Sequence, residues 1–322
     1  MKHNNVFICG WVRELPKVVK NDATGEYVFA MGRIVTLRGL RKFGVRTSRI
    51  KYDEPLIYTQ NPEMCKEIAS WSIGDIVEVK GALTTKDINK VTTCPECKHK
   101  NAQPGNAAYV TPIHCYVRES KGYDKDEAYE ALRRLCEISN NVTLIGVVCR
   151  EPELYRKNKV KITSYQLAVR RKYRIAEDAL ETKTDFPWVK SFGGIGENDA
   201  LVLRKGSYLF LDGWIQTRKF PRETVCECCG HPYKWNDWSL EVVPYASEYV
   251  RNCRTREELQ AEEKARIEKS YKELFADEEP PQTGSIENIE EIEKELDEYN
   301  SFEEHDQDAL RKLSSFEDLD SY

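Results

Sequence analysis

The chain has 322 residues, of which 40% are hydrophobic, and this length suggests about two domains with sizeable cores. Its formal net charge of −5 hides a division, because residues 255–322 carry 23 acidic and 8 basic side chains whereas residues 1–254 carry 31 acidic and 41 basic ones. No apolar run approaches the roughly 18 residues of a membrane span and the N-terminus lacks a signal peptide's apolar core, so we expect a cytoplasmic protein whose basic body suits a polyanion.

The first part of the chain is expected to consist mostly of short strands. Residues 6–12 (VFICGWV) and 76–86 (IVEVKGALTTK) alternate inward and outward side chains around a glycine, which is typical of sharply coiled barrel strands. Between them, Asn61 followed by Pro62 predicts the start of a short helix that runs to about Ser70. Three strands, a short helix and two strands is the element order of the five-stranded OB barrel.

A cysteine turn follows the fourth strand. Residues 94–99 read CPECKH, and a Cys-x-x-Cys pair in a chain without an export signal favours zinc over a disulfide. Structural zinc takes four thiolate or imidazole ligands, so this turn supplies only half of a site.

Residues 124–140 (DKDEAYEALRRLCEISN) come next and predict a linker helix. Asp124 is a suitable N-cap, and Tyr129, Leu132 and Leu135 fall on one face at helical spacing.

The second part of the chain repeats the first. Residues 4–6 (NNV) return at 140–142, and at an offset of 132 positions the cysteine turn returns as CECCGH at 226–231, with its upstream glycines. Such self-similarity indicates a tandem duplication. We therefore expect a mainly β protein with these parts: an OB fold at 1–120, a linker helix at 121–139, a second OB fold at 140–253 and an acidic tail at 254–322.

Two arrangements could complete a zinc site. In the one we favour, a single ion is shared between the copies by Cys94, Cys97, Cys226 and Cys229. In the other, each turn binds its own ion with a local ligand, and the candidates are His99, His114 and Cys115 in the first copy and Cys228 and His231 in the second.

The second copy closely resembles bacterial single-stranded DNA-binding proteins. Four segments carry the resemblance in order along residues 140–245: NNVTLIGVVCREPEL, TSYQLAVRRKY, TDFPWVKSFGGIGENDALVLRKGS and YLFLDGWIQTRKF. One insertion, the cysteine turn between the last two strands, is needed to align them. The first copy resembles the family mainly through the second.

The resemblance implies a surface of rings and cations that binds a single strand without strong sequence preference. Bases stack on exposed aromatic faces while cations follow the backbone. The rings that fall at the family's stacking positions are Tyr173, Phe186, Phe192 and Phe220, with Trp188 as an alternative to Phe186. The cations beside them are Arg170, Arg171, Lys172, Arg174, Arg218 and Lys219.

The first copy departs from this pattern. Glu54, Gln60 and Ile88 align with Phe186, Phe192 and Phe220, so we expect the stacking platform of this copy to be lost. A basic hairpin with Arg41 and Lys42 remains; we expect it to contact phosphates, with a solvated loop or a protein contact as the alternatives.

The leading hypothesis is therefore a non-enzymatic protein that binds single-stranded DNA and protects it during replication, recombination or transfer, as a monomer or low homo-oligomer. The resemblance also implies that the acidic ending, FEDLDSY, recruits replication or recombination proteins; a tail that only adds solubility is the alternative. The alternative is a zinc-clasped adaptor that recruits replication or conjugation enzymes and binds DNA weakly, or binds RNA.

Overall fold

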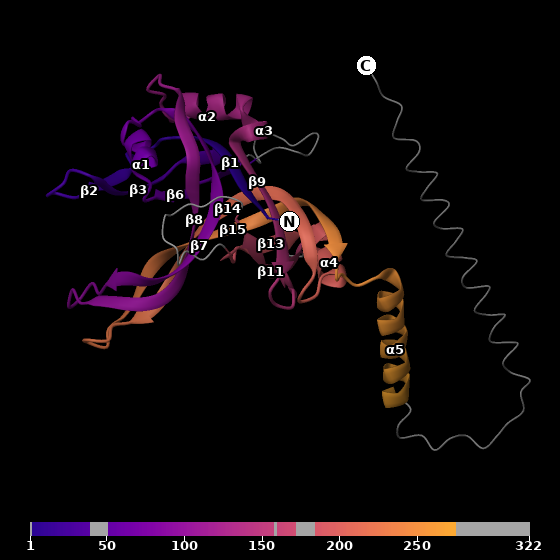
Figure 1. Ribbon diagram of the computed structural model, residues 1–322. Coiled ribbons are helices and arrows are strands. Elements are labelled where there is room, and N and C mark those ends of the chain that lie inside the picture. The colour runs from indigo at the N-terminus through magenta and orange to yellow at the C-terminus, as the bar shows by residue number, and fades with distance from the viewer. Residues whose placement is uncertain (1, 39–50, 158–159, 172–183, 275–322) are drawn as a thin grey trace, which may run out of the picture. The chain divides into compact units, whose positions relative to one another are not determined.

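The computed structural model describes residues 2–38, 51–157, 160–171 and 184–274 (Figure 1). Contacts divide the chain into two compact units, Met1–Leu259 and Gln260–Tyr322, and the first contains all strands of the described residues. The helices in that part of the chain are too short or too polar to cross a membrane. Arg41, Lys42, Lys172, Tyr173, Arg174 and the acidic ending lie outside the described residues.

The chain is mainly β, as expected, and its strands fall into two halves. The first half comprises β1 (His3–Trp11), β2 (Lys17–Lys20), β3 (Tyr27–Arg33), β4 (Val35–Leu37), β5 (Tyr52–Asp53), β6 (Leu56–Thr59), β7 (Ile76–Thr93) and β8 (Lys100–Glu119). The second half comprises β9 (Asn140–Val148), β10 (Glu153–Lys157), β11 (Val160–Arg170), β12 (Thr184–Asp185), β13 (Trp188–Phe192), β14 (Tyr208–Val225) and β15 (Pro232–Arg251).

Helices are few among the described residues. They are α1 (Pro62–Ala69) in the first half, α2 (Lys125–Arg134) and α3 (Cys136–Ser139) between the halves, α4 (Gly193–Val202) in the second half and α5 (Arg256–Leu274) after it. The Asn61 side chain caps α1 by accepting hydrogen bonds from the backbone N–H groups of Glu63 and Met64. The segment between the halves holds two helices where one was expected, because Leu135 leaves the helical conformation at φ −106° and ψ 16°.

The strand order is the same in both halves. The sheet runs β10-β11-β13-β15-β14-β9-β1-β7-β8-β6-β3-β2, so each half reads identically outward from the centre. At the centre β1 pairs antiparallel with β9, and Val6 lies opposite Val142, its own counterpart in the repeat. Both valines belong to one buried hydrophobic cluster, so the core is continuous through the two halves.

Repeated residues make repeated contacts. The Asn4 side chain donates to the carbonyl of Leu83 at 2.7 Å and accepts from its N–H at 2.8 Å. Asn140 does the same with Ile215, at 2.8 and 2.9 Å. Both asparagines are buried, so these paired bonds explain why a polar residue recurs at this place in the core.

The mid-strand glycines are required by a close backbone approach. A Cβ on Gly81 would lie 2.2 Å from the carbonyl oxygen of Thr111, and one on Gly213 would lie 2.2 Å from that of Val243. Each glycine stands at a register shift in its hairpin, where a bulge bends the strand. This bend divides each long hairpin into a basal part inside the half and a distal part, which we call an arm.

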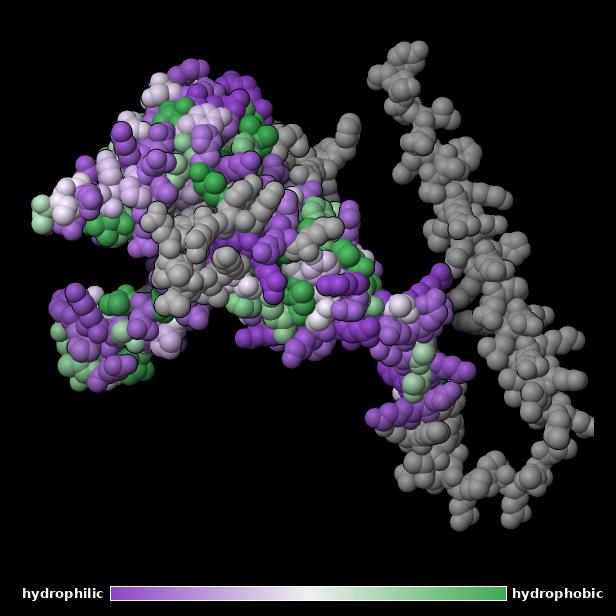
Figure 2. All heavy atoms as spheres, in the orientation of Figure 1, coloured by the Kyte–Doolittle hydropathy of each residue, from purple (hydrophilic) through white to green (hydrophobic). Residues whose placement is uncertain are grey.

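The arms are Thr85–Ala108 and Thr217–Leu240, and they run side by side away from the other strands (Figure 1). Hydrophobic residues stand among hydrophilic ones at their ends (Figure 2).

Candidate functional site

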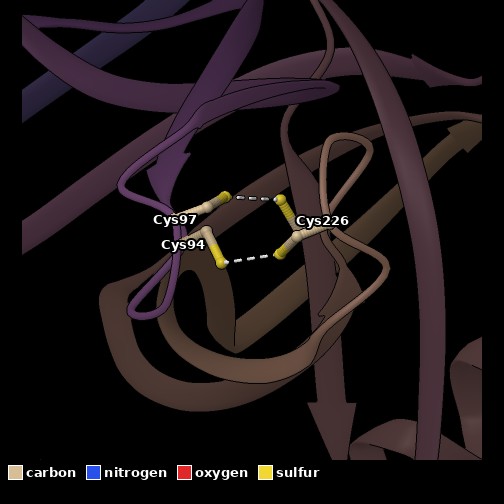
Figure 3. Close-up of side chains that lie close together, drawn as sticks. Cys94, Cys97 and Cys226 are labelled. Atoms are coloured by element: carbon tan, nitrogen blue, oxygen red, sulfur yellow. Dashed lines mark hydrogen bonds between the residues drawn. The ribbon is translucent and has the colours of Figure 1, made fainter.

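Four cysteines meet at the ends of the two arms. Cys94 and Cys97 come from the turn between β7 and β8, and Cys226 and Cys229 come from the turn between β14 and β15 (Figure 3). Their four sulfur atoms lie within 4.8 Å of one another. Two of the distances between sulfurs cross between the arms, 3.7 Å from Cys94 to Cys229 and 3.5 Å from Cys97 to Cys226.

The local backbone explains how each turn presents its cysteines. The N–H of Cys94 donates to the carbonyl of His99 and the N–H of Cys226 donates to that of His231, both at 2.9 Å. The chain reverses through a left-handed residue in each turn, Lys98 at φ 60° and its counterpart Gly230 at φ 72°. The two histidines close the turns through their backbone carbonyls.

The four sulfur atoms lie close enough together that they could hold a metal ion. Four sulfurs at 2.3 Å from a central zinc form a tetrahedron with edges of about 3.8 Å. The distances of 3.5 and 3.7 Å across the arms approach this value. The sequence left open a site shared by four cysteines and two separate sites completed by local ligands such as histidine. The group found among the described residues consists of the four cysteines and includes no histidine.

Ionisation of the thiols is uneven. Burial acts to raise the pKa of the Cys226 thiol, but hydrogen bonds from the backbone N–H groups of Cys229 and Cys228 bring it down to about 6. At Cys97 a hydrogen bond from the His99 backbone lowers the pKa, yet desolvation and the neighbouring thiols raise it to about 12. Four thiolates at this spacing repel one another, and a cation between them would relieve the repulsion.

Further bonds hold the arms together beside the cysteines. The Tyr233 hydroxyl lies 2.7 Å from the Thr92 hydroxyl and accepts a hydrogen bond from the Asn101 amide at 2.7 Å. Farther along the arms, the Lys90 ammonium pairs with the Asp237 carboxylate at 2.6 Å. The cysteine group is therefore part of a contact made by both halves.

Four of the predicted rings of the second half lie in the described residues, and each is at least partly exposed. Phe186 is 40% exposed and Trp188 is 36% exposed, whereas Phe192 and Phe220 are half-buried. Trp188 and Phe192 lie on one face of β13, because the alternate residues Val189 and Ser191 are buried. The Arg150 guanidinium lies over the Trp188 ring, 5.8 Å from its centre.

The predicted cations divide between surface and interior. Arg170, Arg218 and Lys219 are exposed, although Arg218 also pairs with the Glu241 carboxylate at 2.5 Å. Arg171 is only 6% exposed and pairs with buried Asp185 at 2.8 Å. Its charge is neutralised inside the protein, so it does not belong to a phosphate-binding surface.

The second half's arm contacts residues of the first half. Thr217 accepts a hydrogen bond from the N–H of Glu54 at 2.8 Å. The Arg33 guanidinium lies 4.1 Å from the centre of the Trp238 ring, and the Lys219 ammonium lies 6.0 Å from the same centre. Trp238 of the second half therefore contacts an arginine of the first half, a tertiary contact that no local sequence pattern indicates.

Comparisons with known proteins agree with the resemblance of the second copy. Residues 139–226 match the family model described as "Single-strand binding protein family". The single-stranded DNA-binding protein of Staphylococcus epidermidis is 24% identical over 123 residues, which cover 38% of this chain and 88% of that protein. The single-stranded DNA-binding protein of Halalkalibacterium halodurans is 38% identical over 82 residues, which cover 25% of this chain and 48% of that protein.

As with the Halalkalibacterium halodurans protein, this chain spans about half the length of most of the relatives it matches. Among solved structures, the single-stranded DNA-binding protein from Thermus aquaticus matches with a TM-score of 0.50 and 16% identity, over 79% of this chain and 96% of that one. At this identity the match concerns the fold.

Proposed function

We propose that this chain, which carries a domain of the single-strand binding protein family at residues 139–226, binds single-stranded DNA without strong sequence preference. The observation that carries the proposal is the exposed pair Phe186 and Trp188 within that domain, with the Arg150 guanidinium over the Trp188 ring. Its role would be to protect single strands during replication, recombination or transfer.

The surface has the two components that such binding needs. Unstacked bases of any identity gain from contact with an aromatic face, since every base has a π-face. Arg150, Arg170 and Lys219 provide cations for the phosphates, which makes binding sensitive to salt. Phe192 extends the row of rings along β13.

We further propose that the two halves are OB barrels at 1–120 and 140–253, joined by the linker at 121–139. Three features support this division: the strand order is identical in the two halves, their glycine bulges match, and the equivalent strands β1 and β9 pair with each other. The acidic segment 254–322 would then recruit replication or recombination proteins, because its charge disfavours contact with DNA.

The cysteine group is proposed to hold one zinc ion shared by both arms. Four thiolates are a donor set that selects zinc over harder cations such as magnesium or calcium. A site with all four positions filled by protein is structural, and its binding energy stabilises the fold. Here it would fix one arm against the other.

The binding proposal can be tested with the full chain and a fluorescent oligothymidine. We expect tight binding that weakens with salt and is not displaced by duplex competitor. Replacing Trp188 or Phe186 by Ala should weaken binding by about 1–3 kcal/mol per stacked base. Trp188→Phe retains a ring and is the matched control.

A preference for duplex DNA, or equal binding by Trp188→Ala, Phe186→Ala and wild type, would contradict the proposal. Thermal unfolding of each variant would show whether a loss of affinity reflects a loss of folded protein.

A further inference from the structure

Three aromatic rings form a row on the outer face of the first half. The ring centres of Phe29 and Tyr58 lie 6.0 Å apart, and those of Tyr58 and Tyr109 lie 5.1 Å apart in an edge-to-face contact. They come from β3, β6 and β8, and we call them the first-half ring row. None occupies a position that aligns with Phe186, Phe192 or Phe220.

The ring row faces away from the core. Ala30, Ile57 and Val110, the chain neighbours of the three rings, are fully buried. Because successive residues of a strand point to opposite faces, the rings are directed outward, and each is only half-buried. Met31, opposite Tyr58 in the register and on the same face, is 37% exposed.

Comparison with the second half shows that this row replaces charge. Tyr58 and Tyr109 occupy the positions equivalent to Lys190 and Glu241, 132 residues later, where the two side chains form an ion pair at 2.7 Å. An ion pair at these positions would leave a polar surface that water can solvate. Two partly exposed rings at the same places instead add apolar area to an outer sheet face, and apolar area gathered on a surface marks a binding site.

Cations accompany the row, as they accompany the rings of the second half. The Lys17 ammonium lies 6.0 Å from the centre of the Phe29 ring. Arg33 lies on the same strand face as Met31. Its guanidinium lies 4.1 Å from the centre of the Trp238 ring, which belongs to the other half's arm. A pocket of about 160 Å³ lined by Lys17, Met31 and Arg33, among others, continues the face.

We propose that the outer face of β3, β6 and β8 is a second surface for single-stranded DNA, on which bases stack against Phe29, Tyr58 and Tyr109. Lys17 and Arg33 contact the phosphates, and Trp238 of the second arm extends the row. This inference rests on the proposed function, and it replaces the expectation that the first copy has lost base stacking.

The test measures oligothymidine binding by the full chain carrying Tyr58→Ala or Phe29→Ala. Each change should lower the affinity for a long strand at least about 5-fold and reduce the number of nucleotides occluded per chain. Tyr58→Phe keeps the ring and should bind like wild type. The control for position is Tyr208→Ala. It removes a half-buried ring of β14, outside the ring row, that lies against the Arg251 guanidinium, and it should not change the affinity.

A second variant separates this surface from the one in the second half. With Phe186 and Trp188 both replaced by Ala, a strand of about 12 nucleotides, within the range covered by one OB fold, should still bind through the first half. Adding Tyr58→Ala should then abolish that residual binding. Thermal melting of each variant confirms that it is folded.

The outcomes distinguish the two proposals. If wild type binds and both Tyr58→Ala and Phe29→Ala match it in affinity and occluded length, the first-half surface is wrong while the proposed function stands. If wild type itself fails to bind single strands, both are wrong.

Discussion

Asp53 accepts a hydrogen bond from the backbone N–H of Thr217 at 2.8 Å, although the two residues belong to different halves. The counterpart residues repeat the bond in reverse: Asp185 of the second half accepts from the N–H of Thr85 in the first, at 2.9 Å. Each half thus supplies a buried carboxylate to the base of the other half's arm. These bonds hold each arm at its base, at the other end from the cysteines.

Removing one of these carboxylates should be costly. Asp53 is fully buried and also pairs with Arg38 at 2.6 Å, so Asp53→Ala leaves a guanidinium and a backbone N–H without their acceptor. We expect the free energy of unfolding in urea to fall by roughly 3–5 kcal/mol. The exposed acid Asp22 provides a control, and Asp22→Ala should change it by less than about 0.5 kcal/mol. Equal effects of the two changes would refute the role assigned to Asp53.

The proposed shared zinc site predicts how many ions one chain binds. Purified protein should contain one zinc ion per chain, and Cys94→Ser and Cys226→Ser should each remove it although they lie in different halves. Cys228 is exposed and stands outside the group of four, so Cys228→Ser should retain the ion. Elemental analysis of the four proteins decides the matter, and two ions per chain would exclude a shared site.

Two core thiols should be inert. Burial raises the pKa of Cys9 and of Cys115 to about 12, so both remain protonated at neutral pH. Because the thiolate is the reactive form, native protein at pH 8 should leave both unalkylated by iodoacetamide, and the rate should rise only as the pH approaches 12. Peptide mass spectrometry measures the labelling. Rapid modification of Cys115 in folded protein at pH 8 would show that its surroundings are not apolar.

Removing the acidic ending should not lower the affinity for single-stranded DNA. Deleting residues 316–322 should leave the affinity for single-stranded DNA unchanged or raise it at low salt, because the removed acids compete with DNA for the basic surface. Titration of both proteins at two salt concentrations provides the measurement. A marked fall in affinity at moderate salt would mean that the ending supports the binding surface directly.

Local chemistry made some of these features predictable from sequence. Glycines at 81 and 213 and the capping residue Asn61 satisfy requirements set within a hairpin or a single turn, and the two cysteine turns repeat in full. The sequence left two arrangements of a zinc site open, and the one we favour uses the four cysteines that lie together in the structure.

Other features depend on contacts between distant strands. Arg171 reads as one of a run of surface cations, yet a buried carboxylate 14 residues later holds it inside. The first-half ring row was missed because an alignment compares position with position, and two of its three rings, Tyr58 and Tyr109, align with residues that form an ion pair in the other copy. Only the register of β3, β6 and β8 brings Phe29, Tyr58 and Tyr109 together.

The pairing of β1 with β9 has a consequence for how this protein can change. In a symmetric homodimer every substitution appears twice, so no surface can vary without its twin. Here the partner strand is always on the same polypeptide, and a mutation alters one half only. The ion pair of Lys190 with Glu241 in one half and the contact of Tyr58 with Tyr109 in the other show how far that independence has gone. A duplicated chain can therefore keep one face for the inherited task and specialise the other.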